Sequence, residues 1–507
     1  MNEIKKKLLI EKDLKILRKK FLSKKIGLVH GVFDLFHYGH ILHLEKAKTL
    51  CDILVVSITA DKFISKGPGR PFYNNNQRKK LIASMSQVDY VVLSENKSAV
   101  KIIDALKPNL YFKGSDYKDF NKDYSKKILE ETDAVKRNKG AFFLTNEKTF
   151  SSTKLINNYS DNFDPNVKKF LLKSSKEFSF DKIFNIFKKV EKLKILIIGE
   201  MIIDKYTFTT PLGKSPKEQL VPVKIKKSET YGGGVIATAN HISNFVKDCT
   251  VLSIIGNMEK DKNMILNLIN KKVKKQIFVN EESKNIIKHR YIDSENNNKL
   301  FQVSSISEIS INTEKEKKIL NYLKKNIKYF DQIIVHDFGQ GLISDKIIKF
   351  LQKYNSKLSV NVQTNSSNIG YNYITKYSKL NYFSIDEPEA RLALQDKISD
   401  SRTLMKKLAK KIEFKFGTIT FGKYGSNIFD KKDIYFVPAL TTKPIDTMGA
   451  GDAHFAISSL LTKVSKDIKL ISFVGNVAGA LKIQFIGHRK SIQKVDFFNF
   501  IKSVLNI

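Results

Sequence analysis

The sequence predicts a two-domain α/β protein in which each domain is a largely parallel sheet with helices on both faces. First, a chain of 507 residues is longer than one ordinary hydrophobic core can hold. Second, short apolar runs typical of buried strands alternate with helix-like stretches in both halves. Third, the two halves begin alike, because the apolar runs 26–30 and 195–199 each lead into a glycine.

The predicted strands form two groups along the chain. Those of the first half are Ile26–His30, Ile53–Ile58, Tyr90–Leu93 and Leu110–Lys113. Those of the second half are Ile195–Gly199, Val251–Ile255, Gln332–His336, Leu358–Val362, Tyr382–Ile385 and Thr418–Thr420. Between the groups the chain is polar and lysine-rich, with one amphipathic helix marked by the spacing of Phe178, Ile183, Phe184 and Phe187. We therefore predict domains at 1–157 and 193–507, joined by a linker at 158–192.

The composition indicates a soluble cytoplasmic protein rather than a membrane or secreted one. An apolar fraction of 42% is ordinary for a globular chain, and no apolar run reaches the length of about 18 residues that a membrane span needs. Residues 1–20 lack the apolar core of a signal peptide. The two cysteines, Cys51 and Cys249, lie far apart, which fits a reducing compartment.

The net charge of +38 raises the hypothesis of a nucleic-acid-binding protein. Base readout and bidentate phosphate recognition favour arginine, yet only eight of the 89 basic residues are arginine, and the lysines are spread along the whole chain. The sequence shows no clustered arginine or aromatic face. We therefore expect no nucleic-acid partner, and a basic surface that attracts small anionic substrates instead.

The first candidate site is His37-Tyr-Gly-His40, which follows the first predicted strand. Two histidines three residues apart at the start of a helix can point toward one ligand. Gly39 lets a phosphate approach the backbone, and a helix N-terminus offers free N–H groups. Such a site could stabilise charge that develops on an α-phosphate as pyrophosphate leaves. The histidine pair alone leaves a metal site and a purely structural pair open.

The residues around this motif resemble the nucleotidyltransferases with an HxGH motif, the cytidylyltransferase-like group, over about residues 25–157. The matching positions are Lys66, Arg70-Pro71, Gln77-Arg78, Lys113-Gly-Ser-Asp116-Tyr and Phe150-Ser-Ser-Thr153. The resemblance implies a Rossmann-like domain and direct attack of an acceptor phosphate on ATP or CTP.

By this resemblance His37 and His40 stabilise the transition state, and Lys66 neutralises phosphate charge. The implied nucleotide-binding residues are Gly31, Phe33, Asp34, Gly39, Arg78, Asp116, Ser151, Ser152 and Thr153. Arg78 and Asp116 would shape the nucleotide pocket, and residues 151–153 would hold the β- and γ-phosphates.

The second candidate site is the run Asp446-Thr-Met-Gly-Ala-Gly-Asp452. Gly449 and Gly451 precede an apolar helix, so their N–H groups gather as an anion hole. Asp452 stands at that junction, where a carboxylate can accept a proton from a sugar hydroxyl. Many helices begin in a similar way, so the turn alone is weak evidence.

This half resembles the ribokinase-like sugar kinases of the PfkB family, from about residue 193 to the C-terminus. The quoted matches are Asp446–Asp452, Tyr231-Gly-Gly-Gly234 with the helix through Asn240, Asp204, and Thr420-Phe-Gly-Lys-Tyr-Gly425. The resemblance implies an ATP-dependent kinase with Asp452 as catalytic base and a small β lid at 207–230. The implied ligands are Asp204, Gly233, Gly234 and Asn240 for the sugar, Gly449, Ala450 and Gly451 for the anion hole, and Gly422, Gly425 and Asn476 for the nucleotide.

Two positions depart from the family pattern. Ile236 stands where the family usually has an asparagine that contacts the sugar. The Asn-x-x-Glu motif that organises Mg²⁺ appears as Asp386-Glu-Pro-Glu389, which keeps oxygen ligands. We expect Asp386 and Glu389 to hold Mg²⁺, and Ile236 leaves the sugar open.

The two domains together resemble the bifunctional ADP-heptose synthases, with the domain order reversed. Such an enzyme phosphorylates a heptose 7-phosphate at C1 and later transfers a nucleotidyl group to the 1-phosphate, for lipopolysaccharide or surface polysaccharide. The alternative is a monofunctional cytidylyltransferase for a polyol or sugar phosphate, with a degenerate kinase-like domain. The resemblance also allows a homodimer formed through the lids.

Overall fold

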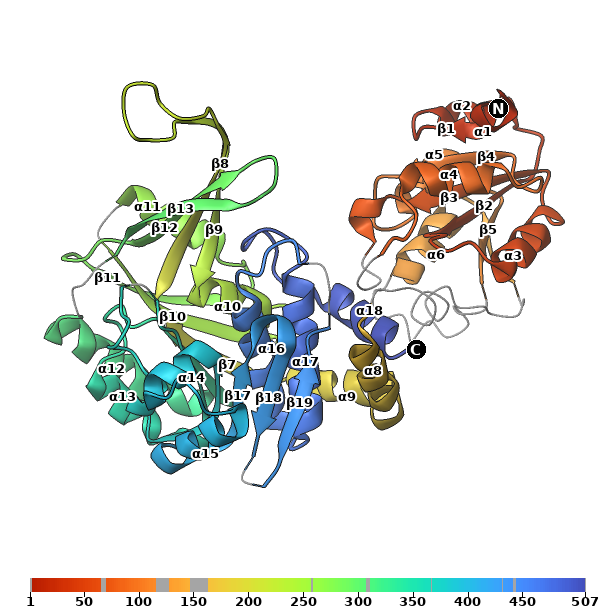
Figure 1. Ribbon diagram of the computed structural model, residues 1–507. Helices are drawn as coiled ribbons and strands as arrows, with labels where there is room; N and C mark the ends of the chain where they lie inside the picture. The colour runs from red at the N-terminus through yellow and green to blue at the C-terminus, as the bar shows by residue number, and fades with distance from the viewer. Residues whose placement is uncertain are drawn as a thin grey trace. The chain divides into compact units, whose positions relative to one another are not determined.

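The structure is a computed structural model that describes residues 2–64, 70–114, 127–145, 163–256, 259–306, 311–365, 367–430, 432–440 and 444–506 (Figure 1). The chain forms two compact units. Unit 1 comprises Met1–Asp164 with Phe498–Ile507, and unit 2 comprises Pro165–Phe497. No helix within these described ranges is both long and apolar enough to cross a membrane.

Unit 1 contains a six-stranded sheet in which all the pairings are parallel. In spatial order its strands are β1 (Leu8–Leu9), β4 (Tyr90–Ser94), β3 (Ile53–Thr59), β2 (Ile26–Gly31), β5 (Leu110–Lys113) and β6 (Ala141–Leu144). The strand order reverses between β2 and β5. In an open parallel sheet, ligands bind outside the carboxyl ends of the strands at such a reversal. The segment that follows β2 therefore occupies the expected place of a site.

Helices cover both faces of this sheet. They are α1 (Asn2–Lys7), α2 (Asp13–Lys20), α3 (Tyr38–Lys48), α4 (Asn75–Ala83), α5 (Val100–Leu106) and α6 (Lys127–Arg137). Leu28 packs in a cluster with residues of α2, α5 and α6, whereas the next residue, Val29, packs in a second cluster with α3 and α4. Because successive side chains of a strand point to opposite faces, a strand buried on both sides is apolar throughout.

Unit 2 contains a nine-stranded sheet. Its strands in spatial order are β11 (Lys274–Asn280), β10 (Asp248–Gly256), β7 (Lys194–Gly199), β14 (Gln332–Asp337), β15 (Leu358–Val362), β16 (Lys379–Asp386), β17 (Glu413–Thr420), β18 (Gly425–Phe429) and β19 (Ile434–Pro438). The pairings from β11 to β17 are parallel, and β18 and β19 add an antiparallel edge. The predicted pair of α/β domains with parallel sheets is confirmed.

Helix α18 (Lys494–Val504) spans the division between the units, because Phe498–Ile507 belong to unit 1. The helices before it, from residue 165 onward, surround this sheet. They are α8 (Pro165–Glu177), α9 (Phe180–Val190), α10 (Val235–Ile242), α11 (Glu259–Leu268), α12 (Thr313–Asn326), α13 (Asp345–Gln352), α14 (Glu387–Leu394), α15 (Ser401–Lys411), α16 (Ala450–Val464) and α17 (Ile468–Lys482). Of these, α16 is buried along almost its whole length, as expected for a helix between a sheet and α17.

The segment predicted to carry one amphipathic helix contains two, α8 and α9, and both pack on unit 2. The ring of Phe178 lies 5.8 Å from that of Phe473 in α17, and the ring of Phe187 lies 5.5 Å from that of Phe245. Glu177 forms an ion pair with Lys469. The periodicity of a helix shows which side is buried, but it does not identify the surface that covers that side.

A second, four-stranded sheet in unit 2 forms the lid, and Figure 1 shows it standing out from the large sheet. Its strands in order are β13 (Lys299–Ser305), β12 (Ile286–Asp293), β8 (Met201–Pro211) and β9 (Val223–Gly234). The predicted lid at 207–230 thus covers only part of it, since β12 and β13 come from a separate stretch of the chain. Gly234, with φ +59, ends β9 where α10 begins.

Candidate active sites

In unit 1 the structure brings the two histidines of the first motif together. His37 is the N-cap of α3, directly after the loop that leaves β2, and Gly39 is the second residue of the helix. The rings of His37 and His40 are stacked with centroids 3.8 Å apart, and the His37 backbone N–H donates to His40 Nδ1 at 3.3 Å. The pair therefore lies at the start of a helix and at the sheet reversal, where a phosphate can approach both rings.

The loop between β2 and α3 is fixed by Phe33 and Asp34. Phe33 is buried with a left-handed φ of 50°, and its ring lies 5.2 Å from that of His40. A Cβ on Gly31 would come within 3.1 Å of the Phe33 ring. The buried carboxylate of Asp34 accepts from the backbone N–H of Phe72 at 2.5 Å and pairs with Arg70 at 3.3 Å. These contacts hold the histidine loop against the segment before α4.

Arg78, in α4, is fully buried. Its guanidinium donates to the carbonyl oxygens of Val32 at 2.6 Å and Tyr73 at 3.0 Å, and to the side chains of Asp61 and Asn75. One guanidinium thus joins the loops after β2 and β3 to the start of α4. These contacts shape the loops around the histidines, and all of them are made to protein groups.

Four ionisable residues lie close to one another at the carboxyl ends of the unit 1 strands. Burial, followed by Lys113, lowers the pKa of His30 to about 3 and that of His43 to about 4. Burial would raise the pKa of Glu131, but Lys113, 3.1 Å away, and further hydrogen bonds bring it down to about 2. The two histidines are therefore neutral, and Glu131 is a carboxylate at neutral pH.

Five residues of the predicted transferase site lie outside the described residues. They are Lys66, Asp116, Ser151, Ser152 and Thr153.

In unit 2, Asp452 lies in the first turn of α16 and is almost fully buried. Gln363 donates from Nε2 to Asp452 Oδ1 at 2.6 Å, and His336 Nε2 lies 3.4 Å from the same oxygen. Burial raises the pKa of Asp452, but the hydrogen bond with His336 and the electrostatic influence of the surrounding histidine rings more than offset this and lower it. Asp452 is therefore a carboxylate at neutral pH, held in position by two side chains.

The predicted anion hole precedes Asp452. Gly449 is the N-cap of α16 with φ +75, a conformation that suits glycine. A Cβ on Gly451 would meet no atom within 4 Å, so open space borders the first turn beside Ala450. Asp446 holds the turn, because it accepts from the backbone N–H of Met448 at 3.1 Å. A 15-residue helix that begins in this way offers free N–H groups to a phosphate.

The lid contributes Asp204, which is buried on β8 and ion-paired with Arg290 of β12. A Cβ on Gly233 would lie 2.2 Å from Asp204 Oδ2, so only glycine fits beside this carboxylate. His488 Nε2 lies 3.4 Å from the same oxygen. The predicted sugar ligands Asp204, Gly233 and Gly234 are thus neighbours in the lid.

Lys482 is a buried lysine between the anion hole and the loop that follows α17. Its ammonium donates to the carbonyl oxygens of Met448 at 2.8 Å and Gly487 at 2.7 Å. Burial lowers its pKa to about 8, against the opposing influence of Asp446, Asp452 and Asp204. Lys482 therefore remains largely protonated at pH 7 and ties the two loops together.

Asp386 and Glu389 form a reciprocal cap at the start of α14, in which each side chain accepts from the backbone N–H of the other residue at 2.8 Å. Burial, then Asp386, raises the pKa of Glu389 to about 8. A cation beside the pair would relieve this repulsion. No cluster of three or more His, Cys, Asp or Glu suited to a metal occurs among the described residues. Mg²⁺ is commonly held by one or two carboxylates plus phosphates and water, so the pair fits it.

The predicted nucleotide residues of unit 2 lie at the antiparallel edge of the sheet. Gly422 and Gly425 have φ of +53 and +121, and a Cβ on Gly425 would lie 2.1 Å from the Val437 carbonyl oxygen. Asn476 of α17 donates to Ser426 Oγ at 2.6 Å. The turn between β17 and β18 therefore depends on its glycines and contacts α17 through Asn476.

Two positions at α10 face the protein itself. The Asn240 amide donates to the Leu268 carbonyl at 2.8 Å and accepts from the Asn270 backbone N–H at 2.7 Å, so its hydrogen bonds hold that loop. Ile236 is fully buried, and its side chain occupies the space that a Cβ on Gly232 would need. The structure therefore groups neither side chain with the contacts around Asp452.

The sequence analysis did not identify His336, Gln363, Lys482 and His488. His336 and Gln363 stand at the carboxyl ends of β14 and β15, where parallel sheets place ligand residues. This rule could have identified the first two residues. Lys482 and His488 follow no motif, and only the tertiary structure brings them to Asp446 and Asp204.

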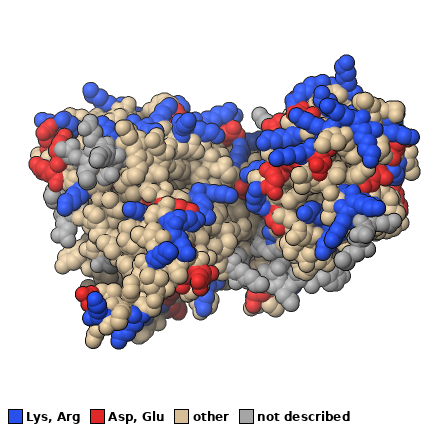
Figure 2. All heavy atoms as spheres, turned by 90° about the horizontal axis from the view of Figure 1, so that it is seen from above, with Lys and Arg blue, Asp and Glu red and all other residues tan. Residues whose placement is uncertain are grey.

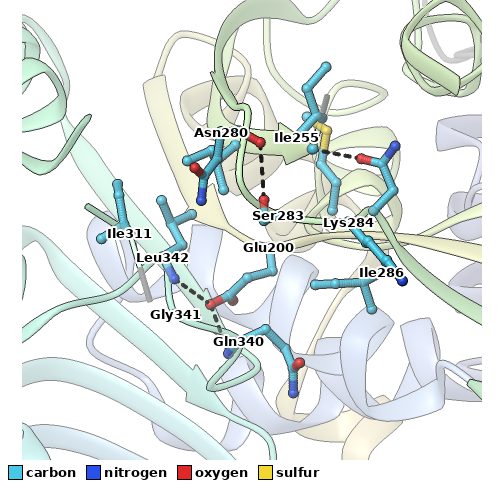
Figure 3. Close-up of a pocket in the computed structure, with 14 residues that line it drawn as sticks. Glu200, Ile255, Asn280, Ser283, Lys284, Ile286, Ile311, Gln340, Gly341 and Leu342 are labelled. Carbon is cyan, nitrogen blue, oxygen red and sulfur yellow. Dashed lines mark hydrogen bonds between the residues drawn. The ribbon is translucent and has the colours of Figure 1, made fainter. Parts of the chain in front are cut away.

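A small cavity lies at the base of the lid (Figure 3). Glu200, at the end of β7, is buried there and accepts from the backbone N–H groups of Phe338, Gln340 and Leu342. Burial, then Asp337, raises the pKa of Glu200 to about 7. Because Glu200 accepts from three N–H groups of one loop, we infer that it supports the loop after β14, the strand whose carboxyl end carries His336.

The surface charge is dispersed. On the face drawn in Figure 2, lysine and arginine side chains are interspersed with acidic and uncharged ones. The expectation that the chain has no nucleic-acid partner stays a prediction from the sequence.

Residues 28–158 match the cytidylyltransferase-like family, and residues 192–495 match the pfkB family of carbohydrate kinases. The chain is 37% identical over 153 residues to the bifunctional protein HldE of Campylobacter jejuni subsp. doylei, which covers 30% of this chain and 31% of that protein. It is 47% identical over 97 residues to the bifunctional protein HldE of Helicobacter pylori (strain HPAG1), covering 19% of this chain and 21% of that protein.

These matches lie in the N-terminal part of the chain. The chain spans about a third or less of the length of these curated relatives. Among solved structures, ribokinase from Thermotoga maritima is similar with a TM-score of 0.47 and 16% identity, covering 61% of this chain and 99% of that chain.

We predict that Arg78→Ala destabilises unit 1 by about 3 kcal/mol, because it leaves several buried acceptors without a donor. Arg137→Ala is the matched control, since Arg137 pairs with Asp104 at the surface, where an ion pair contributes little to stability. Hydrogen–deuterium exchange of the β2 amides measures both changes in the full-length chain. Equal protection in the two variants would contradict the positioning role of Arg78.

We also predict that unit 1 loses stability as the pH falls from 6.5. The pKa of His30 is about 3 in the folded chain, so between these values the unfolded chain binds a proton that the folded chain does not. At pH 5 this costs about 2 kcal/mol for one histidine. His30→Asn should therefore flatten the decline in β2 protection between pH 7.5 and 5. The loss from Glu131 begins only below its ordinary pKa of 4.5. An unchanged slope in the variant would show that His30 is protonated in the folded state.

Proposed function

The chain belongs to the pfkB family of carbohydrate kinases, and from this premise we propose that it is a bifunctional sugar-phosphate kinase and sugar-1-phosphate nucleotidyltransferase. Its product would be a nucleotide-activated sugar of the ADP-heptose type, for lipopolysaccharide or surface polysaccharide in the cytoplasm. The observation that carries the proposal is the charged, buried Asp452 at the N-terminus of α16. In unit 1, the stacked His37–His40 pair supplies a second phosphate-binding arrangement.

In the kinase step, the sugar binds under the lid with its hydroxyls on Asp204. Asp452 accepts the proton of the attacking hydroxyl, whose oxygen forms the bond to the γ-phosphorus of ATP while the bond to ADP breaks. The N–H groups at Gly449, Ala450 and Gly451 stabilise the charge on the transferred group. Asp386 and Glu389 would hold Mg²⁺, which supplies neutralisation of the phosphate charge.

In the transferase step, a phosphate oxygen of the sugar 1-phosphate attacks the α-phosphorus of the nucleoside triphosphate, and pyrophosphate leaves. His37 and His40 stabilise the charge on the α-phosphate, and no covalent enzyme intermediate is required. Lys66, Asp116 and residues 151–153 complete this proposal by family resemblance. The nucleotide is ATP or CTP, and ATP is favoured by the heptose route.

The matched relatives support the transferase half of the proposal most directly. Both are named bifunctional proteins, and both are similar to the N-terminal part of this chain. The order of the two matched families along the chain, transferase first, supports a reversed arrangement of the same pair of activities.

A homodimer through the lids is part of the proposal. The lid strands expose large apolar side chains, including Ile225 at 60%, Val303 at 56% and Phe301 at 50%. Exposed apolar patches on a soluble protein commonly mark contact surfaces, and a second lid would cover this one.

The second candidate function is a cytidylyltransferase for a polyol or sugar phosphate, with a kinase-like domain that is inactive. Ile236 favours it, because an apolar, fully buried side chain stands where a sugar-binding asparagine is expected. This alternative predicts pyrophosphate release without sugar-dependent consumption of ATP.

We predict that Asp452→Asn and His40→Ala separate the two activities, so each variant is the control for the other. Asp452→Asn should reduce sugar-dependent ADP formation at least about 100-fold, because the base is lost. Pyrophosphate release from a sugar 1-phosphate should remain. His40→Ala should reverse this pattern, with a loss of about 100-fold or more in pyrophosphate release. Loss of both activities in one variant would contradict two independent sites.

Incubation of the full-length protein with heptose 7-phosphate and ATP, and separately with sugar 1-phosphates and ATP or CTP, tests the reactions. We expect a mass gain of one phosphoryl group in the first case and a nucleotide sugar in the second. Mass spectrometry identifies both products. Formation of a CDP-linked product with no ATP consumption would favour the cytidylyltransferase alternative.

A further inference from the structure

His488 is a buried histidine in the loop that follows α17. Its side chain is only 6% exposed. The loop is fixed on both sides of it, because the Gly487 backbone N–H donates to Asp446 at 2.8 Å and Arg489 donates to Tyr231 of the lid at 3.2 Å. The Tyr206 ring fills the space that a Cβ on Gly487 would need. The position of His488 is therefore set by the anion-hole turn and by the lid together.

The imidazole ring extends from the lid carboxylate to the glycine at the start of α16. Its Nε2 lies 3.4 Å from Asp204 Oδ2. On its other side, a Cβ on Gly449 would lie 2.7 Å from Cε1 and 3.3 Å from Nδ1. The ring thus lies between the carboxylate of Asp204 and the glycine that precedes α16.

One ring nitrogen has no partner in the protein. Nδ1 of His488 is buried and makes no hydrogen bond within the part of the chain that the structure describes. Nε2 faces a carboxylate, so it carries the hydrogen, and burial lowers the pKa of the ring. Nδ1 is then a hydrogen-bond acceptor. A buried polar atom without a partner is costly, and a ligand hydroxyl would remove that cost.

We propose that His488 is a substrate-contacting residue of the kinase site, whose Nδ1 accepts a hydrogen bond from a hydroxyl of the acceptor sugar. Asp204 and His488 then hold neighbouring hydroxyls of one polyol, with Asp452 left to receive the proton. The assignment rests on the proposed kinase function and adds a specificity-determining residue to it. A site that hydrogen-bonds a substrate hydroxyl discriminates strongly against an analogue that lacks it.

The test compares His488→Phe, which removes the acceptor atom, with His488→Asn, whose amide places a polar atom near the position of Nδ1. Kinetics use the full-length chain with ATP and heptose 7-phosphate. His488→Phe should raise the KM for the sugar about 10- to 100-fold, with the KM for ATP changed less than about twofold. His488→Asn should restore most of the loss. His289→Phe, at a lid histidine that contacts Thr207, is the matched control.

Direct binding of heptose 7-phosphate, measured by calorimetry, gives a readout without turnover. If His488→Phe binds the sugar as tightly as the wild-type protein does, the assignment is overturned and the kinase function stands. A fall in kcat with unchanged KM would also overturn it, since it would place the ring on the transferred phosphoryl group. Wild-type protein that neither binds nor phosphorylates the sugar would contradict the kinase function, and this assignment with it. If His488→Phe does not fold, His488→Asn must still bind the sugar, or the assignment fails.

Discussion

The carboxylate of Asp446 joins three segments of unit 2, and the geometry of the kinase site depends on it. It accepts from the Met448 backbone N–H in the anion-hole turn, from the Gly487 backbone N–H in the loop after α17, and from Lys299 of the lid at 2.7 Å. Lys482 binds the carbonyl oxygens of the same two loops. Asp446 and Lys482, one buried anion and one buried cation, therefore fix the position of the first turn of α16 relative to the lid. Catalysis by positioning requires groups that are held this precisely.

The charges of this site balance each other at short range. Asp204 is paired with Arg290 and Asp446 with Lys299, while Asp452 contacts Gln363 and His336. Uncompensated burial of a charge is far more costly than burial of a paired one. Asp452 is the exception among the three, because its contacts are an amide and a histidine rather than a permanent cation. A carboxylate held in this way stays ionised yet can take up a substrate proton without breaking an ion pair.

Local sequence patterns predicted the framework well. The strands and the glycine turns at 31–40 and 446–452 could be found because their apolar runs and glycines are contiguous in the sequence. The lid was underestimated because β12 and β13 come from a later stretch of the chain, far in sequence from β8 and β9. A role for His488 could not be predicted from the sequence, because its neighbour Asp204 is distant in the chain and its neighbour Gly449 belongs to another motif. Asn240 follows the glycine motif, and its hydrogen bonds in the structure hold the loop at Leu268 and Asn270, so its role as a sugar ligand stays a prediction.

The chemistry of the proposed pair of reactions sets a condition on what lies between them. A kinase that takes a sugar phosphate as its acceptor releases a bisphosphate, whereas a transferase that attacks through the 1-phosphate needs that group alone to react. A bisphosphate carries a second phosphomonoester that the nucleotide sugar does not retain. In the proposed route, loss of that ester therefore falls between the two steps, as a reaction separate from phosphoryl transfer at Asp452 and from nucleotidyl transfer at His37 and His40.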